Sequence, residues 1–201
     1  MKTLNLALCL ASLGLATASQ AVVIFSFEGG TDGFVNPAWS VGDTALSQNS
    51  FGATDGSQSL KVQRPGASNG FRWIVADGVS TEVKQNLKNS THLLVDVTIG
   101  TDFGASSWFK MSLVLNQAAW NQTPELLISP TTPGTHTLDF DISALAPNIV
   151  VNDWMRFGFS INSDGPSATT TYLDNFRAVP EPASLAIFGL GLAALKLRRK
   201  R

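Results

Sequence analysis

The sequence predicts an all-β protein that folds as an antiparallel β-sandwich of about eight to ten strands. Apolar and polar residues alternate in one segment after another between the two ends of the chain, as in strands that bury one face. Clusters of Gly, Pro, Asn, Asp and Ser separate these segments, which is typical of turns. Only two short stretches, 80–89 and 142–145, could form a helical turn.

Four segments show the alternation most clearly, and these are residues 93–99, 108–117, 138–142 and 154–162. In the first of them Leu93, Val95, Val97 and Ile99 share one face. Further strands are expected at 22–28, 59–63, 71–76 and 170–178. Trp73 shares a face with apolar neighbours on both sides, so we expect it in the core.

Residues 1–21 have the features of a secretory signal peptide. Lys2 supplies a short positive start, an apolar stretch follows, and the small residues Ser19 and Ala21 lie where cleavage is expected. Cys9 is the only cysteine, and we expect it to be removed with this segment. The mature chain would then have neither a disulfide nor a cysteine nucleophile.

Residues 22–179 form one domain of ordinary size. They contain 14 Asp and Glu residues against 8 Lys and Arg residues, a formal charge of −6. An acidic domain with scattered cations is not expected to bind nucleic acid. Because the mature chain would have no disulfide, its stability must come from a packed core, with or without a metal ion.

Residues 180–201 combine three elements in a fixed order. Pro180, Glu181 and Pro182 are expected to form a stiff, solvent-facing spacer that neither continues a strand nor starts a helix before itself. The uncharged run 183–195 follows, and at about 1.5 Å per residue it covers roughly 20 Å, short of the ~30 Å bilayer core. The chain then ends in five basic residues, Lys196, Arg198, Arg199, Lys200 and Arg201.

This tail resembles the PEP-CTERM sorting signal of Gram-negative bacteria. The resemblance implies export by the general secretory machinery and transient insertion in the inner membrane. It also implies processing by an exosortase, followed by release to the cell surface or the extracellular matrix. An ordinary single-pass anchor is the alternative, and the short apolar run argues against it.

The domain resembles the jelly-roll fold of carbohydrate-binding modules and galactose-binding-like domains. Short motifs at three strand ends carry this resemblance: Phe27-Glu28 with Asp32-Gly33, then Asp55-Gly56-Ser57, and finally Tyr172-Leu173-Asp174-Asn175. In that fold the first and last strands lie side by side, which implies that Glu28 lies near Asp174. No sugar-contacting motif matches residue by residue.

These strand ends predict a structural calcium site. Glu28, Asp55 and Asp174 could supply the hard oxygen ligands that calcium prefers. The alternative is that Glu28 is solvated at a sheet edge and Asp174 caps a turn.

The sequence also predicts a surface that contacts a glycan. The sequence contains five tryptophans but only one tyrosine. Two of the tryptophans, Trp108 and Trp154, fall on the polar faces of their strands. An exposed indole can stack on a sugar ring while polar neighbours bond its hydroxyl groups. The candidate contacts are Trp108, Lys110, Asn116, Trp154 and Arg156. Each tryptophan could instead cover the end of the core.

No complete catalytic motif is evident. A Gly-x-Ser-x-Gly sequence occurs at residues 66–70, but it lies between two predicted strands and lacks the strand-to-helix turn that a serine nucleophile needs. There is no His-Glu-x-x-His pair. Asp139 and Asp141 share a strand face about 7 Å apart, a separation that glycosidases use, but such pairs are commonly solvated. The sequence therefore predicts an exported, non-enzymatic surface or matrix protein associated with exopolysaccharide. A dedicated carbohydrate-binding module and a surface glycoside-active enzyme remain as alternatives.

Overall fold

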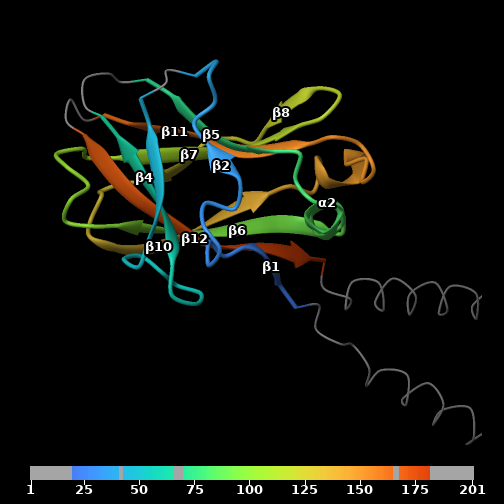
Figure 1. Cartoon of the computed structure of the whole chain (residues 1–201), viewed down its shortest axis with the longest axis horizontal. Coiled ribbons are helices and arrows are strands. Elements are labelled where there is room, and N and C mark those ends of the chain that lie inside the picture. The colour runs from blue at the N-terminus through green and yellow to red at the C-terminus, as the bar shows by residue number, and fades with distance from the viewer. Residues whose placement is uncertain (1–19, 41–42, 66–69, 165–167, 182–201) are drawn as a thin grey trace, which may run out of the picture.

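Two antiparallel sheets pack face to face in the computed structural model, which describes residues 20–40, 43–65, 70–164 and 168–181 (Figure 1). The predicted all-β sandwich is confirmed. The described residues contain twelve strands, more than the sequence suggests, because short segments such as β2 and β8 are too brief to show alternation. The predicted signal peptide and most of the sorting tail lie outside the described residues.

The first sheet, sheet A, has the strand order β10-β6-β12-β4-β3, with β1 added beside β12. The bounds of its strands are β1 Val22–Phe25, β3 Ala45–Asn49, β4 Ser59–Arg64, β6 Ser90–Ile99, β10 Gly134–Asp141 and β12 Thr169–Pro180.

The second sheet, sheet B, has the order β2-β5-β11-β7-β8, and β9 also pairs with β7. The bounds of its strands are β2 Phe34–Val35, β5 Arg72–Asp77, β7 Phe109–Asn116, β8 Trp120–Gln122, β9 Leu126–Ile128 and β11 Arg156–Ser163.

Strand β12 is the longest strand and lies in the middle of sheet A. It pairs with β6 along one edge, and with β4 and then β1 along the other. The first and last strands are therefore neighbours, with Val22 opposite Ala178. The chain enters and leaves the sandwich at the same end (Figure 1).

Strand β12 also extends further than the sequence suggests. It ends at Pro180, so the first proline of the predicted spacer belongs to the sheet. Proline has no N–H to donate and is tolerated where a strand ends or bulges. The register of β12 against β6 shifts between Val179 and Pro180, which is such a place.

The core between the sheets is built around phenylalanines. The ring of Phe176 on β12 lies 5.1–6.4 Å from five other phenylalanine rings, which come from both sheets and from the chain around β1 and β2: Phe25, Phe27, Phe34, Phe157 and Phe159. Most of these contacts are edge-to-face, the arrangement that aromatic quadrupoles favour.

One helix closes the end of the sandwich. α2 spans Thr81–Lys88 and begins after Ser80, whose side chain accepts a hydrogen bond from the N–H of Val83, as expected for an N-cap. Leu87 is buried against the core, and Lys84 and Lys88 each donate to a backbone carbonyl of the loop before β11. The predicted helical turn at 80–89 is therefore confirmed.

The turn expected at 142–145 leads into a short 3-10 helix, η2, at Ala146–Asn148. The N–H of Ala146 donates to the carbonyl of Ile142, so the two form one continuous turn.

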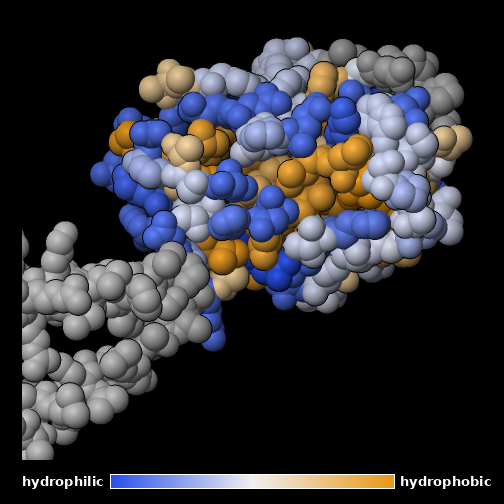
Figure 2. All heavy atoms as spheres, turned by 180° about the vertical axis from the view of Figure 1, so that it is seen from behind, coloured by the Kyte–Doolittle hydropathy of each residue, from blue (hydrophilic) through white to orange (hydrophobic). Residues whose placement is uncertain are grey.

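Hydrophobic residues also reach the surface. Figure 2 shows them gathered in the middle of the side opposite to that of Figure 1, with hydrophilic residues around them. Among the described residues, no helix is long and apolar enough to cross a membrane.

Replacing Phe176 with alanine should destabilise the domain strongly. The change removes the ring that joins five others and leaves a cavity, a loss of about 3–5 kcal/mol in the free energy of unfolding. Chemical denaturation followed by far-UV circular dichroism measures this loss. Phe51→Ala is the matched control, because Phe51 is 51% exposed and its ring packs on Tyr172. Equal losses for the two variants would contradict this description of the core.

Candidate functional site: a tryptophan face on sheet B

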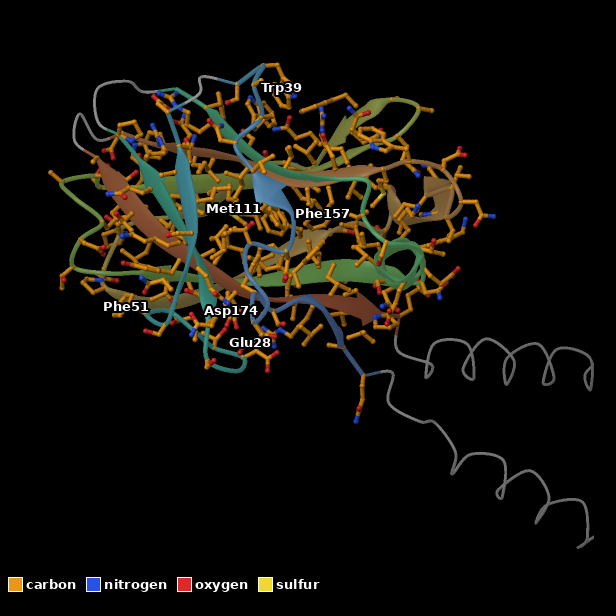
Figure 3. All side chains as sticks on the ribbon, viewed as in Figure 1. Glu28, Trp39, Phe51, Met111, Phe157 and Asp174 are labelled. Carbon is orange, nitrogen blue, oxygen red and sulfur yellow. The ribbon has the colours of Figure 1, made fainter. Side chains whose placement is uncertain are left out.

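Four tryptophans gather on the outer face of sheet B. The rings of Trp39, Trp73 and Trp120 lie 5.0–5.8 Å from one another, and Trp39 also faces the guanidinium of Arg156 at 5.2 Å. Trp154 lies on the same guanidinium at 5.5 Å. We call these four tryptophans and Arg156 the tryptophan face; Figure 3 labels Trp39 above sheet B.

Trp73 corrects a prediction made from the sequence. It was expected in the core, yet the core side of β5 is formed by Ile74 and Ala76. Trp73 points to the outer face together with Val75, which is fully buried although it does not belong to the core cluster. The apolar character of Val75 therefore comes from cover on the outside of the sheet, and not from the interior.

Trp39 reaches the face from the segment that follows β2. The side-chain amide of Asn36 donates to the carbonyl of Trp73 at 3.0 Å, and the N–H of Trp73 donates to the hydroxyl of Ser40 at 3.4 Å. These bonds hold the short segment 36–40 along the edge of the sheet, so that Trp39 lies beside Trp73. This neighbour relation joins distant parts of the sequence and leaves no local signal.

The ion pair of Arg156 and Asp77 fixes the middle of the tryptophan face. Two parallel bonds, at 2.6 and 2.8 Å, join the guanidinium to the carboxylate across paired strands. Their hydrogen bond holds the pKa of Asp77 below its usual range and raises the pKa of Arg156. Both groups therefore stay charged, and the guanidinium is held within 5.5 Å of the ring centres of two indoles, Trp39 and Trp154.

Trp39, Trp120 and Trp154 are each 42–51% exposed, so part of every ring faces solvent. Polar groups lie among them. The amide of Gln122 donates to Ser112 at 2.6 Å, and the hydroxyl of Ser160 is buried without a hydrogen-bond partner. Exposed indoles beside fixed polar groups can stack on sugar rings and bond their hydroxyl groups.

The predicted glycan contacts fall at two ends of this sheet. Arg156 and Asn116 are directly paired at one end, where Trp154 also lies. Lys110 is six residues from Asn116 along β7, roughly 20 Å away, and its ammonium lies 5.2 Å from the ring of Trp108. Trp39, Trp73 and Trp120 were not among the predicted contacts.

The predicted calcium ligands meet at one loop on the other sheet. Glu28 accepts hydrogen bonds from the N–H groups of Ser57 and Gln58, both at 2.8 Å, and from the hydroxyl of Ser57. These bonds, led by the Ser57 N–H, lower the pKa of Glu28. Asp174 accepts from the N–H groups of Thr54 and Asp55, at 2.6 and 2.8 Å. The two carboxylates thus hold opposite ends of loop 54–58 (Figure 3).

Asp174 is fully buried, and its second oxygen, Oδ1, has no hydrogen-bond partner. Burial raises the pKa of Asp174 in spite of the N–H groups of Asp55 and Thr54. Asp96 is its direct cross-strand neighbour on β6, and the carboxylate of Asp96 accepts hydrogen bonds from four side chains: Thr54, Thr137, Asn175 and Arg177. An orphaned carboxylate oxygen of this kind fits a cation.

Other features do not fit the predicted ligand set. The side-chain amide of Gln48 donates to the carbonyls of Phe27 and Glu28, at 2.6 and 3.0 Å. Glu28 is already bound by three donors, and Asp55 contributes its N–H. Among the described residues, no three His, Cys, Asp or Glu side chains form a group that could hold a metal ion.

The aspartates considered for catalysis lie on sheet A, away from the tryptophan face. Asp139 contacts the ring of His92 at 2.7 Å, and Asp141 accepts from the N–H and hydroxyl of Ser143. These contacts are those of a solvated strand face.

Comparison with solved structures shows that the fold of the sandwich is similar to that of carbohydrate-binding modules. A Caldicellulosiruptor saccharolyticus CBM27-1 in complex with mannohexaose gives a TM-score of 0.60 at 17% identity, over 82% of this chain and 99% of that one. A carbohydrate-binding module specific for non-crystalline cellulose, CBM28, gives a TM-score of 0.57 at 17% identity, over 81% of this chain and 97% of that one. A family 11 module from Clostridium thermocellum gives 0.55 at 10%, over 82% and 98%. This chain spans 62% of a further matching chain, in a study of modules from the β-sandwich superfamily.

Residues 178–201 match the PEP-CTERM protein-sorting motif. The chain carries a PEP-CTERM signal. The motif implies export, sorting to the cell surface and processing by an exosortase. No curated protein matches the sequence.

Asp174 should make the stability of the metal-free domain depend on pH. Because its folded pKa is raised, the protonated form contributes stability that is complete below the ordinary value of 3.8 and is lost as the pH rises through the folded pKa. Asp174→Asn should flatten this part of the profile, measured as melting temperature against pH in EDTA. Glu28→Gln is the control of opposite sign, because the pKa of Glu28 is lowered and its contribution is lost as the pH falls. An unchanged profile in Asp174→Asn would contradict the assignment.

Proposed function

We propose that this chain is an exported, non-enzymatic surface protein whose jelly-roll sandwich binds a glycan through the tryptophan face. The single observation that carries the proposal is the cluster of half-exposed indoles around a fixed arginine on the outside of sheet B. The likeness to carbohydrate-binding modules supports the fold on which such a face is built.

The cluster would bind by stacking and hydrogen bonding. A sugar ring lies against the exposed faces of Trp39, Trp120 and Trp154, while Gln122 and the ion pair of Arg156 offer hydrogen bonds to hydroxyl groups. Burying indole surface against the apolar face of a sugar supplies the free energy, and the polar groups orient the chain.

Lys110 and Trp108 extend the same sheet face at its far end. A glycan long enough to cross the sheet would reach them, whereas a short oligosaccharide held at Trp39 would not. The tail implies sorting to the surface, where we propose that the partner is extracellular polysaccharide in a Gram-negative envelope or matrix. Processing by an exosortase and transient insertion of the tail in the inner membrane precede release.

Trp39→Ala and Trp120→Ala should each weaken glycan binding. Loss of a central aromatic anchor typically costs about 2 kcal/mol or more, roughly thirtyfold in Kd. Affinity gel electrophoresis against a panel of soluble polysaccharides measures the retention.

Phe51→Ala is the control for these variants, because it removes an equally exposed ring from the outer face of sheet A. Trp154→Ala should weaken binding as well, and Trp108→Ala should weaken binding of long chains alone. Retention that survives both Trp39→Ala and Trp120→Ala would overturn the proposal.

We further propose that calcium binds beside Asp174 and stabilises the junction of β1, β12 and loop 54–58. The buried, unpartnered Oδ1 of Asp174 supports this site. The Glu28 and Asp55 side chains, which the sequence also suggests as ligands, would have to turn toward it. Such an ion would compensate the buried charge of Asp174 and tie the first and last strands to the loop.

Calcium should raise the melting temperature of the purified domain, and EDTA should reverse the rise. Asp174→Asn should abolish the response, whereas Asp139→Asn on the same sheet should leave it intact. A wild-type melting temperature that is the same in calcium and in EDTA would contradict the proposed calcium site.

A further inference from the structure

The sorting motif begins inside the folded domain. Its match starts at Ala178, yet β12 continues to Pro180. Ala178 is 1% exposed and lies between two strands, opposite Val22 of β1 on one side and Leu93 of β6 on the other. The first three residues of the motif are therefore residues of the central strand of sheet A.

The pairing of β12 with β6 ends at Pro180. Val179 is opposite His92 and Pro180 is opposite Ser90, both on β6. Glu181 is the first exposed residue, and it lines a shallow pocket with the end of α2 and with Ser143 and Pro147. The chain thus leaves the sheet at the middle of the Pro-Glu-Pro sequence.

A peptide bond inside a paired central strand is closed to a protease. Cleavage requires the backbone on both sides of the bond to leave its hydrogen-bonded partners, so the rate follows the population of the opened state. Opening β12 at Ala178 would break its pairing with both β1 and β6 and uncover Phe176, which is the centre of the core. Glu181 lies outside the strand, so a cut between Pro180 and Glu181 needs only the last residues of β12 to open and leaves the pairing of Ala178 with Val22 in place.

We propose that processing of the sorting motif cuts carboxyl-terminal to Pro180, so that the mature protein keeps the whole of β12. The bond between Pro180 and Glu181 is the first one with a residue outside the strand on its carboxyl side. The reaction is hydrolysis of one backbone amide: water gives its hydroxyl to the new carboxyl group and its proton to the released amine. The inference rests on the proposed processing and adds the position of the cut.

The position of Val22 restricts the processing enzyme as well. Because Val22 pairs with Ala178, strand β1 lies two residues from a cut between Pro180 and Glu181. An enzyme that cuts at this bond must accept a folded sandwich within about one residue, roughly 3.5 Å of extended chain, of its active centre.

The test is the mass of the processed protein purified from a host that contains an exosortase, with sequencing of its carboxyl-terminal peptide. The expected mature chain ends at Pro180 or later. A mature chain that ends at Val179 or earlier would overturn the inference while leaving the sorting proposal intact. A chain that keeps its whole basic tail in the membrane would overturn both, and its greater mass tells the two failures apart.

A four-residue Gly-Ser-Gly-Ser insertion between Val179 and Pro180 provides a second readout. It moves Pro180 and the residues after it away from the sheet, so the cut should stay at the same motif bond and the mature product should be four residues longer. The same insertion between the exposed residues Thr132 and Pro133 is the control, and it should leave the terminal peptide unchanged.

Amide hydrogen exchange on the full chain tests the cause without the host. The amides of Ala178 and Val179 should exchange slowly, and the amide of Glu181 fast. Fast exchange at Ala178 would contradict the protection on which the inference depends.

Discussion

The pairing of β12 is the constraint on which the rest of this structure depends. One strand joins β6, β4 and β1 in a single sheet and carries Phe176 into the centre of the core. It also carries Asp174, which holds loop 54–58 against the outside of the sheet, and it ends at the proline where the sorting tail begins. Fold, candidate ion site and processing point therefore meet on twelve consecutive residues.

The two faces of sheet B lie in different environments, one in the core and one on the outside of the sandwich. Its inner face supplies Phe157 and Phe159 to the core, while its outer face is covered by indoles held around Arg156. The strands under the tryptophan face are fixed by the core on their other side. A site that is rigid before it binds loses less conformational entropy on binding a glycan.

Most of the fold could be predicted from the sequence, because a long strand that buries one face alternates between apolar and polar residues. β6, β7, β10 and β11 all lie where alternation placed them. The tryptophan face could not be predicted. Val75 and Trp73 are apolar because an outer layer covers them, and alternation cannot tell an outer layer from a core. Trp39 reaches Trp73 and Arg156 through contacts between distant segments, which no local pattern records.

The candidate ion site shows a similar division. The resemblance at three strand ends brings Glu28, Asp55 and Asp174 correctly to one loop. It does not reveal that backbone N–H groups already occupy the Glu28 carboxylate, or that one oxygen of Asp174 is left without a partner. The irregular backbone beside Asp174 is equally hidden from the sequence: the register of β12 against β6 shifts after Asp174, and Asn175 has a positive φ of 52°.

The central claim is that the indoles on sheet B form a glycan-binding surface. The most direct measurement is a titration of the 15N-labelled mature domain with soluble oligosaccharides, followed through the indole N–H resonances of its five tryptophans. We expect saturable shifts for Trp39, Trp120 and Trp154 with at least one oligosaccharide, and a smaller response from Trp108. Shifts confined to Trp108, or none with any oligosaccharide, would contradict this claim.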